Sequence, residues 1–114
     1  MRVHQYAFIR RAVDGDTFEI VLDLGFDITF VVHVRIKGVN TAELHDVDPI
    51  KKKLAEDERD FARTFEGKKC QVNVYRKERY GRWESDLIVD RTSYADLLKA
   101  KFPDAIVPFG AEYD

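Results

Sequence analysis

The fold is decided by the stretch 17–36, which reads TFEIVLDLGFDITFVVHVRI. Apolar residues alternate with other residues twice in this stretch, and Gly25 lies between the two runs. A period of two is typical of β-strands, and glycine at a reversal permits a tight turn. We therefore expect two antiparallel strands with apolar inward faces. The side chains expected to face the core are Phe18, Ile20, Leu22, Leu24, Ile28, Phe30, Val32, Val34 and Ile36.

The same alternation predicts that Arg35 faces away from the core. In the second strand Arg35 is expected on the same face as His33 and Lys37, and Val34 and Ile36 are expected on the other face. Successive side chains of a strand lie on opposite faces of the sheet. Arg35 is therefore available to contact something outside the apolar core.

Further elements follow on both sides of this hairpin. An extended run, 3–13, ends at an Asp14-Gly15 turn, and later strands are expected around 70–74 and 83–89. A helix is expected from a cap at Asp48 to Gly67, with an apolar stripe that begins at Ile50. A shorter helix follows Ser93.

Five strands with a helix between the third and the fourth are typical of the oligonucleotide-binding (OB) barrel. The predicted fold class is therefore a β-barrel with helices (α+β), of the five-stranded OB type. With 114 residues the chain is expected to form one domain, 1–114.

Composition excludes several classes of protein. Hydrophobic residues make up 45% and charged residues 35%, as in folded soluble domains. No apolar run approaches the roughly 20 residues of a membrane helix. The N-terminal residues lack a secretory signal, which predicts a cytoplasmic protein if the chain is complete. The single Cys70 excludes an internal disulfide, and a net charge of −2 argues against binding nucleic acid through bulk charge.

Three polar stretches lie at the ends of the expected strands: DGDT at 14–17, GVNTAE at 38–43 and RYGR at 79–82. Alone, each is also explained as an ordinary turn or surface loop. Together with Arg35 they supply the groups that metal-assisted phosphodiester cleavage needs. Carboxylates bind the cation and activate water, and guanidinium groups bind the phosphate.

In combination these stretches resemble the staphylococcal nuclease (thermonuclease) family. That family has an Asp-Gly-Asp-Thr turn, an Arg-x-x-x-x-Asp-Thr-Pro-Glu segment and a Tyr-Gly-Arg loop, in the same order and at similar spacing. The resemblance covers about residues 3–102. It implies the five-stranded barrel with helices that the strand and helix order also predicts.

The resemblance implies calcium-dependent hydrolysis of DNA and RNA that releases the 5′ oxygen. Glu43 would be the general base on the attacking water, and Arg35 and Arg82 would bind the phosphate and stabilise the transition state. Arg79 and Tyr80 match positions that contact a terminal phosphate of the bound nucleotide.

The implied calcium ligands are the Asp16 carboxylate and the main-chain carbonyl of Thr41, with Asp14 acting through a water molecule. Two positions differ from the family. Asn40 replaces an aspartate ligand, and the lost charge predicts calcium binding weaker by about 1–4 kcal/mol. Ala42 replaces a proline, which loosens the loop before Glu43.

The leading hypothesis is thus a calcium-dependent nuclease that acts on flexible or single-stranded DNA or RNA. The alternative is a nuclease-like module that binds nucleic acid with weak or no catalysis because of Asn40. A third possibility is a structural or protein-binding barrel. We expect a monomer with no membrane partner.

Overall fold

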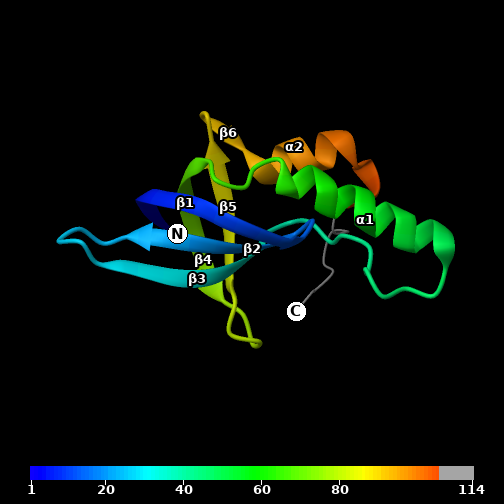
Figure 1. Ribbon diagram of the computed structural model, residues 1–114, viewed down its shortest axis with the longest axis horizontal. Helices are drawn as coiled ribbons and strands as arrows, with labels where there is room; N and C mark the ends of the chain where they lie inside the picture. Colours follow the sequence, from blue (N-terminus) through cyan, green and yellow to red (C-terminus); the bar gives the residue numbers. More distant parts are fainter. Residues whose placement is uncertain (106–114) are drawn as a thin grey trace.

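The computed structural model describes residues 1–105 of the chain, and the last nine residues of the expected domain lie outside the described residues. A β-barrel occupies one half of the molecule and two helices the other half (Figure 1). No helix within residues 1–105 is both long enough and apolar enough to span a membrane. The elements are β1 (Arg2–Asp14), β2 (Thr17–Asp23), β3 (Thr29–Ile36), α1 (Pro49–Arg63), β4 (Lys69–Lys77), β5 (Trp83–Val89), β6 (Thr92–Ser93), α2 (Tyr94–Lys101) and a short 3-10 helix (Pro103–Ala105).

Five strands form a closed barrel. Neighbouring strands follow the order β3-β2-β1-β4-β5, and a parallel pairing between β3 and β5 closes the ring. This pairing is short: Val34, Arg35 and Ile36 lie opposite Trp83, Glu84 and Ser85, respectively. The predicted β-barrel with helices is confirmed.

Strand β1 is long and bends, so that its two halves pair with different strands of the barrel. Its C-terminal half pairs with β2, and its N-terminal half pairs with β4. The register shifts between Ile9 and Arg11 and between His4 and Ala7. Such irregularities increase the local bend of a strand. They allow one strand to curve around the barrel.

The helices cover one end of the barrel through an aromatic cluster. Phe18 of β2 packs edge-on against Tyr94 of α2, with ring centroids 4.8 Å apart. Phe65 makes a similar contact with Tyr94, and Phe61 stacks on the same ring. The Tyr94 hydroxyl donates a hydrogen bond of 2.6 Å to the carbonyl oxygen of Gly15, which ties α2 to the β1–β2 turn.

Helix α1 begins as predicted and ends earlier. The Asp48 side chain accepts a hydrogen bond from the Ile50 N–H, as an N-cap does. The helix ends at Arg63, and Gly67, with φ of +83°, belongs to the turn that follows. Ile50 is 81% exposed, so its assignment to the buried stripe was wrong. The most buried face carries Ala55, Glu58 and Ala62 instead.

The inward faces of β2 and β3 are buried only where other elements cover them. Phe18, Ile20, Val34 and Ile36 are fully buried, as predicted. The other ends of the two strands project beyond the barrel (Figure 1). The inward-facing residues expected there are therefore exposed, contrary to prediction: Leu24, Ile28 and Phe30.

We predict that Tyr94→Phe lowers the free energy of unfolding by about 1–3 kcal/mol, because the buried Gly15 carbonyl loses a donor while the ring packing remains. Urea denaturation measures this change. Tyr75→Phe, at an exposed position on β4, is the matched control and is expected to change stability little. Equal stability of Tyr94→Phe and the native chain would contradict this role of the hydroxyl.

Candidate active site

Two segments that carry predicted site residues, the β1–β2 turn and the loop after β3, meet helix α1 at Gly15. A Cβ atom at this position would lie 2.8 Å from Cγ2 of Thr41 and 2.9 Å from Cβ of Glu58. Real Cβ atoms do not approach neighbours so closely, so only glycine fits without a shift of the surroundings. The turn, the loop after β3 and helix α1 are thereby held in direct contact.

The Asp16 carboxylate lies at the centre of this contact and is 4% exposed. One oxygen, Oδ2, forms an ion pair with Arg35 and accepts a hydrogen bond of 3.1 Å from the Thr41 N–H. The other oxygen accepts a bond from the Thr17 hydroxyl. Burial alone would raise the pKa of Asp16, but the hydrogen bond with the Asp14 side chain, the charge of Arg35 and the bond from Thr41 together lower it.

Arg35 lies on the face of β3 predicted from the alternation, but it is only 6% exposed. It is buried because the β1–β2 turn and the loop after β3 cover it. One guanidinium nitrogen pairs with Asp16, and another donates to the amide oxygen of Asn40 at 3.3 Å. Arg35 therefore links two of the proposed calcium-binding residues.

Asp14 is the second carboxylate of the turn. Its Oδ1 accepts a hydrogen bond of 3.0 Å from the Asp16 N–H. Burial, the hydrogen bond to the Asp16 side chain and the Asp16 charge raise the pKa of Asp14 to about 7. Near neutral pH the two carboxyl groups therefore carry between one and two negative charges, and Asp14 is the one that holds the proton.

Helix α1 positions the loop that leads to Glu43. The buried Glu58 carboxylate accepts a hydrogen bond of 3.0 Å from the Ala42 N–H. Burial raises the pKa of Glu58. Glu43 follows directly, and its side chain is exposed. Because Cα atoms two residues apart are separated by at most about 7 Å, its backbone lies close to that of Thr41 and so to the Asp16 cluster.

A tight turn before β5 holds Arg82. Its Nε and Nη2 atoms donate to the two carboxylate oxygens of Glu78, at 2.9 and 2.8 Å. This pairing raises the pKa of Arg82 and lowers that of Glu78. The charges of Asp16 and Asp14 raise the pKa of Arg82 further. Arg82 also lies two residues before Glu84, which is paired with Arg35 across β3 and β5, so its backbone is close to that of the Asp16 cluster.

Tyr80 projects from the same turn and is 61% exposed. The guanidinium of Arg79 lies 5.0 Å from its ring centroid, and that of Arg82 lies 5.8 Å from it. Arg79 also donates a hydrogen bond of 3.0 Å to the Tyr80 hydroxyl. Two guanidinium groups therefore lie near one largely exposed aromatic ring.

The structure thus joins Asp14, Asp16, Arg35, Asn40 and Thr41 directly and places Arg82 within electrostatic range of the two aspartates. Sequence analysis missed two carboxylates that organise this arrangement, Glu58 and Glu78. Glu78 lies four residues before Arg82, a spacing that permits an ion pair across a short turn.

Oxygen atoms make up the proposed calcium site: the Asp16 carboxylate, the Asn40 amide oxygen and the Thr41 carbonyl. Hard cations such as calcium prefer such donors. No group of three or more His, Cys, Asp or Glu side chains converges within residues 1–105. In type these oxygens fit a calcium ion, but Arg35 already contacts Asp16 Oδ2 and Asn40 Oδ1, so a bound ion would share both oxygens with its guanidinium group.

We predict that Asp14→Asn stabilises the folded protein above pH 7 by about 1–3 kcal/mol, measured with a chelator present. The ordinary pKa of 3.8 rises to about 7 on folding, so the stability contributed by the neutral carboxyl is complete below pH 3.8 and is lost as the pH rises through 7. Asparagine remains neutral and keeps an oxygen for the Asp16 N–H.

Denaturation at several pH values measures the effect, and the difference from the native chain should disappear in acid. Asp60→Asn, on the exposed face of α1, is the control. A stability difference that stays constant from acid to alkaline pH would contradict the raised pKa of Asp14.

Comparisons with known proteins do not assign the chain to a family. No protein-family model matches it, and no curated protein is significantly similar to it in sequence.

Proposed function

We propose that the protein is a calcium-dependent nuclease that hydrolyses phosphodiester bonds of DNA or RNA, and that its barrel is an OB fold of the staphylococcal nuclease-like type. The observation that carries this proposal is the set of contacts around Asp16. Its carboxylate contacts Arg35 and the Thr41 N–H, and Arg35 contacts Asn40. Residues that nuclease chemistry needs, from distant parts of the sequence, thus surround one carboxylate.

Each residue has a distinct role in the proposed reaction. Asp16 and the loop oxygens of Asn40 and Thr41 would hold the cation, and a cation there would supply positive charge to the phosphate in the transition state. Arg35 and Arg82 donate to non-bridging phosphate oxygens. Glu43, which is exposed in the same loop, takes a proton from the attacking water, and the water oxygen displaces the 5′ oxygen from phosphorus.

The neighbouring turn suits a single-stranded substrate. Tyr80 is largely exposed and has two guanidinium groups 5.0 and 5.8 Å from its ring centroid, so a splayed base can stack on the exposed part of the ring while its phosphate meets Arg79. A base inside a duplex does not expose its face in this way. The proposed substrate is therefore flexible or single-stranded nucleic acid.

One observation favours the alternative of a binding module with little catalysis. Both arginines are already paired with carboxylates, Arg35 with Asp16 and Arg82 with Glu78. A phosphate must compete with these partners for the guanidinium groups. Together with the neutral Asn40, this competition lowers the expected rate but leaves the general base in place.

We predict that the purified protein cleaves labelled single-stranded oligonucleotides with calcium and stops when a chelator is added. Glu43→Gln and Arg82→Ala should each lower the rate by about 10²–10⁴-fold, because they remove the general base and a phosphate-binding cation. Gel analysis of the products measures the rates.

Matched controls use residues of the same type on α1: Glu56→Gln and Arg63→Ala should retain the native rate. Oligonucleotide binding without cleavage in calcium, magnesium or manganese would favour the binding module. Absence of both binding and cleavage would contradict both functions.

We predict that Asn40→Asp tightens calcium binding by about tenfold or more, since it restores a charge next to Asp16. Calorimetric titration measures the affinity. Asn73→Asp on β4 adds the same charge elsewhere and serves as the control. No gain in affinity for Asn40→Asp would contradict the placement of the cation at this loop.

A further inference from the structure

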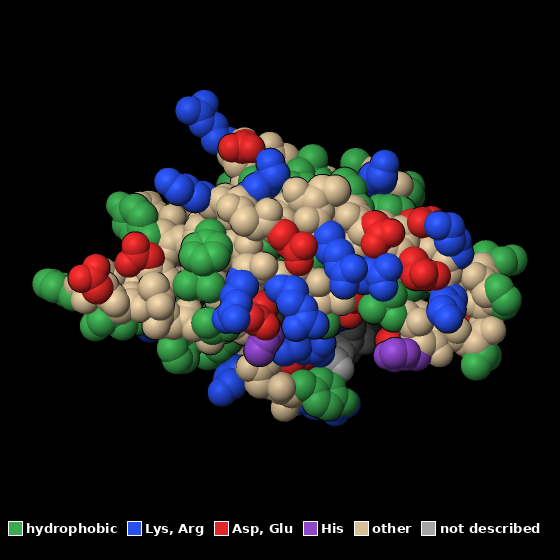
Figure 2. Space-filling view, viewed as in Figure 1, with side chains coloured by type: hydrophobic (Ala, Val, Ile, Leu, Met, Phe, Trp, Pro, Cys, Tyr) green, Lys and Arg blue, Asp and Glu red, His purple; other side chains and the backbone are tan. Residues whose placement is uncertain are grey.

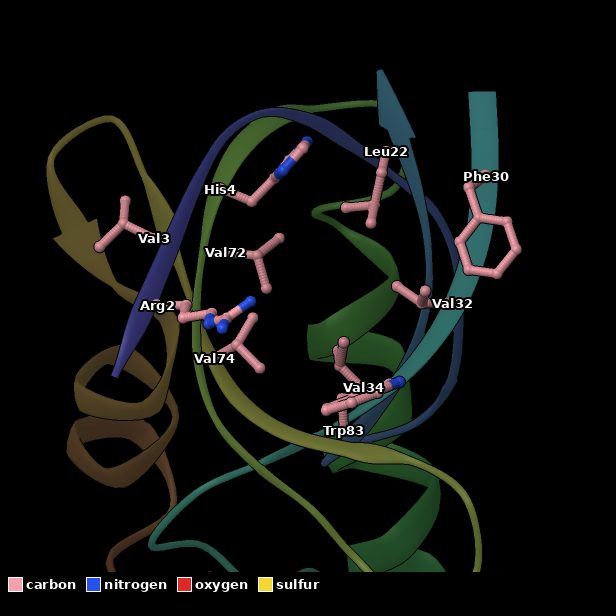
Figure 3. Close-up of a pocket in the computed structure, with 10 residues that line it drawn as sticks. All are labelled: Arg2, Val3, His4, Leu22, Phe30, Val32, Val34, Val72, Val74 and Trp83. Atoms are coloured by element: carbon pink, nitrogen blue, oxygen red, sulfur yellow. The ribbon is translucent and has the colours of Figure 1, made fainter. Parts of the chain in front are cut away.

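The end of the barrel opposite the helices contains an open apolar pocket of about 350 Å³ (Figure 3). We call it the barrel-end pocket. An apolar cavity of about 150 Å³ already admits a benzene molecule, so this pocket has room for an aromatic side chain. Its walls are Arg2, Val3, His4, Leu22, Phe30, Val32, Val34, Val72, Val74 and Trp83.

A fully exposed aromatic side chain lies on the β2–β3 hairpin. Phe26, in the tip formed by residues 24–28, is 97% exposed, and Leu24 and Ile28 beside it are also exposed. In Figure 2, hydrophobic side chains with acidic ones among them cover this end of the molecule. Exposed apolar clusters of this kind are typical of interaction sites.

Local folding does not explain a phenylalanine at this position. Phe26 and Asp27 have φ values of +53° and +60°, and the Ile28 N–H donates to the Gly25 carbonyl, which together describe a type I′ turn. Asparagine and glycine are preferred at its two central positions. Left-handed backbone at a bulky residue costs about 1–2 kcal/mol. The turn thus holds a phenylalanine ring in a strained backbone conformation, although this ring is almost fully exposed and does not pack against the barrel of its own molecule.

The hairpin cannot fill its own pocket. Leu22 and Phe30 form part of the pocket wall, and Phe26 lies four residues beyond each of them along the hairpin. The paired strands end at Asp23 and Thr29, and Phe26 lies in the turn beyond them with 97% of its surface exposed, so its ring does not enter the pocket. Phe26 is therefore available to the pocket of a second molecule.

Charges on the tip and around the pocket are complementary. Asp23 and Asp27 are exposed beside Phe26. Arg2 lines the pocket, and the ammonium group of Lys77 lies 5.6 Å from the ring centroid of Trp83 in its wall. An aromatic side chain flanked by carboxylates thus matches an apolar pocket flanked by cations, and this chain carries both.

We infer that the hairpin tip of one molecule docks into the barrel-end pocket of a second copy, with Phe26 in the pocket and Asp27 near its cationic residues. A two-fold axis allows both molecules to make this contact at once. The outer edge of β3 from Thr29 to His33, which pairs with no strand in the described part of the chain, lies beside the pocket and is available for the same interface. This inference departs from the expected monomer and does not depend on the proposed nuclease activity.

Sedimentation velocity over a wide concentration range tests the inference. The native chain should form a dimer, and Phe26→Ser, which removes both rings from a two-fold dimer, should raise the dissociation constant by about a thousandfold, since the loss of one central aromatic anchor raises it by about thirtyfold. Val47→Ser removes an apolar side chain that is 96% exposed in another loop and should leave association unchanged. A native chain that remains monomeric at all concentrations, or equal effects of the two substitutions, would overturn the inference.

A mixing experiment separates docking from nonspecific association. Val32→Trp fills the pocket but leaves Phe26, whereas Phe26→Ser removes the ring but leaves the pocket. Each variant alone should be monomeric, while an equimolar mixture should form a heterodimer with one of the two contacts. Circular dichroism verifies that both variants fold. If the native chain dimerises and the mixture of folded variants does not, Phe26 does not enter this pocket.

Discussion

The arrangement of the candidate site depends on the close contact that Gly15 makes in the β1–β2 turn. At this position a side chain larger than a hydrogen atom would collide with the neighbouring elements. Gly15 brings the turn against Thr41 of one loop and Glu58 of helix α1. The Tyr94 hydroxyl fixes the same residue from the other helix. Asp16 follows Gly15 directly, so the position of its carboxylate is set by packing among four elements far apart in the sequence.

Burial gives these polar groups their electrostatic properties. A buried carboxylate must be paired or protonated, because an isolated charge is costly away from water. Asp16 is paired with Arg35 and keeps its charge, whereas Asp14 beside it takes up a proton more readily than usual. The two aspartates of one turn thus differ in protonation near neutral pH, because Asp16 pairs with Arg35 and Asp14 lies beside the Asp16 charge.

Alternation in the sequence predicted which face of β2 and β3 each side chain occupies, because a period of two is a property of the backbone. It did not predict what covers each face. Ile28 has the spacing of a core residue but lies beyond the paired strands, and Phe30 has the same spacing but lines the open end of the barrel. Arg35 has the spacing of a surface residue but is buried under a loop. Coverage depends on tertiary packing, which local patterns do not contain.

In the candidate site, too, local motifs predicted some residues, while others were recognised only from the tertiary contacts. Motifs identified Asp16, Arg35 and Arg82, but not the carboxylates that hold the loop and the arginine, Glu58 and Glu78. Glu58 lies at helical spacing from two buried alanines, Ala55 and Ala62. Small residues on one helical face indicate close approach to another element, and this was the signal available in the sequence.

The most direct test of the proposed chemistry is a crystal structure of the protein with calcium and a short single-stranded oligonucleotide that resists hydrolysis. The account predicts calcium bound to Asp16 and the loop oxygens at Asn40 and Thr41. It also predicts a phosphate in contact with both Arg35 and Arg82, and a water molecule between that phosphate and Glu43. An oligonucleotide bound on another face, or a Glu43 carboxylate directed away from the phosphate, would contradict it.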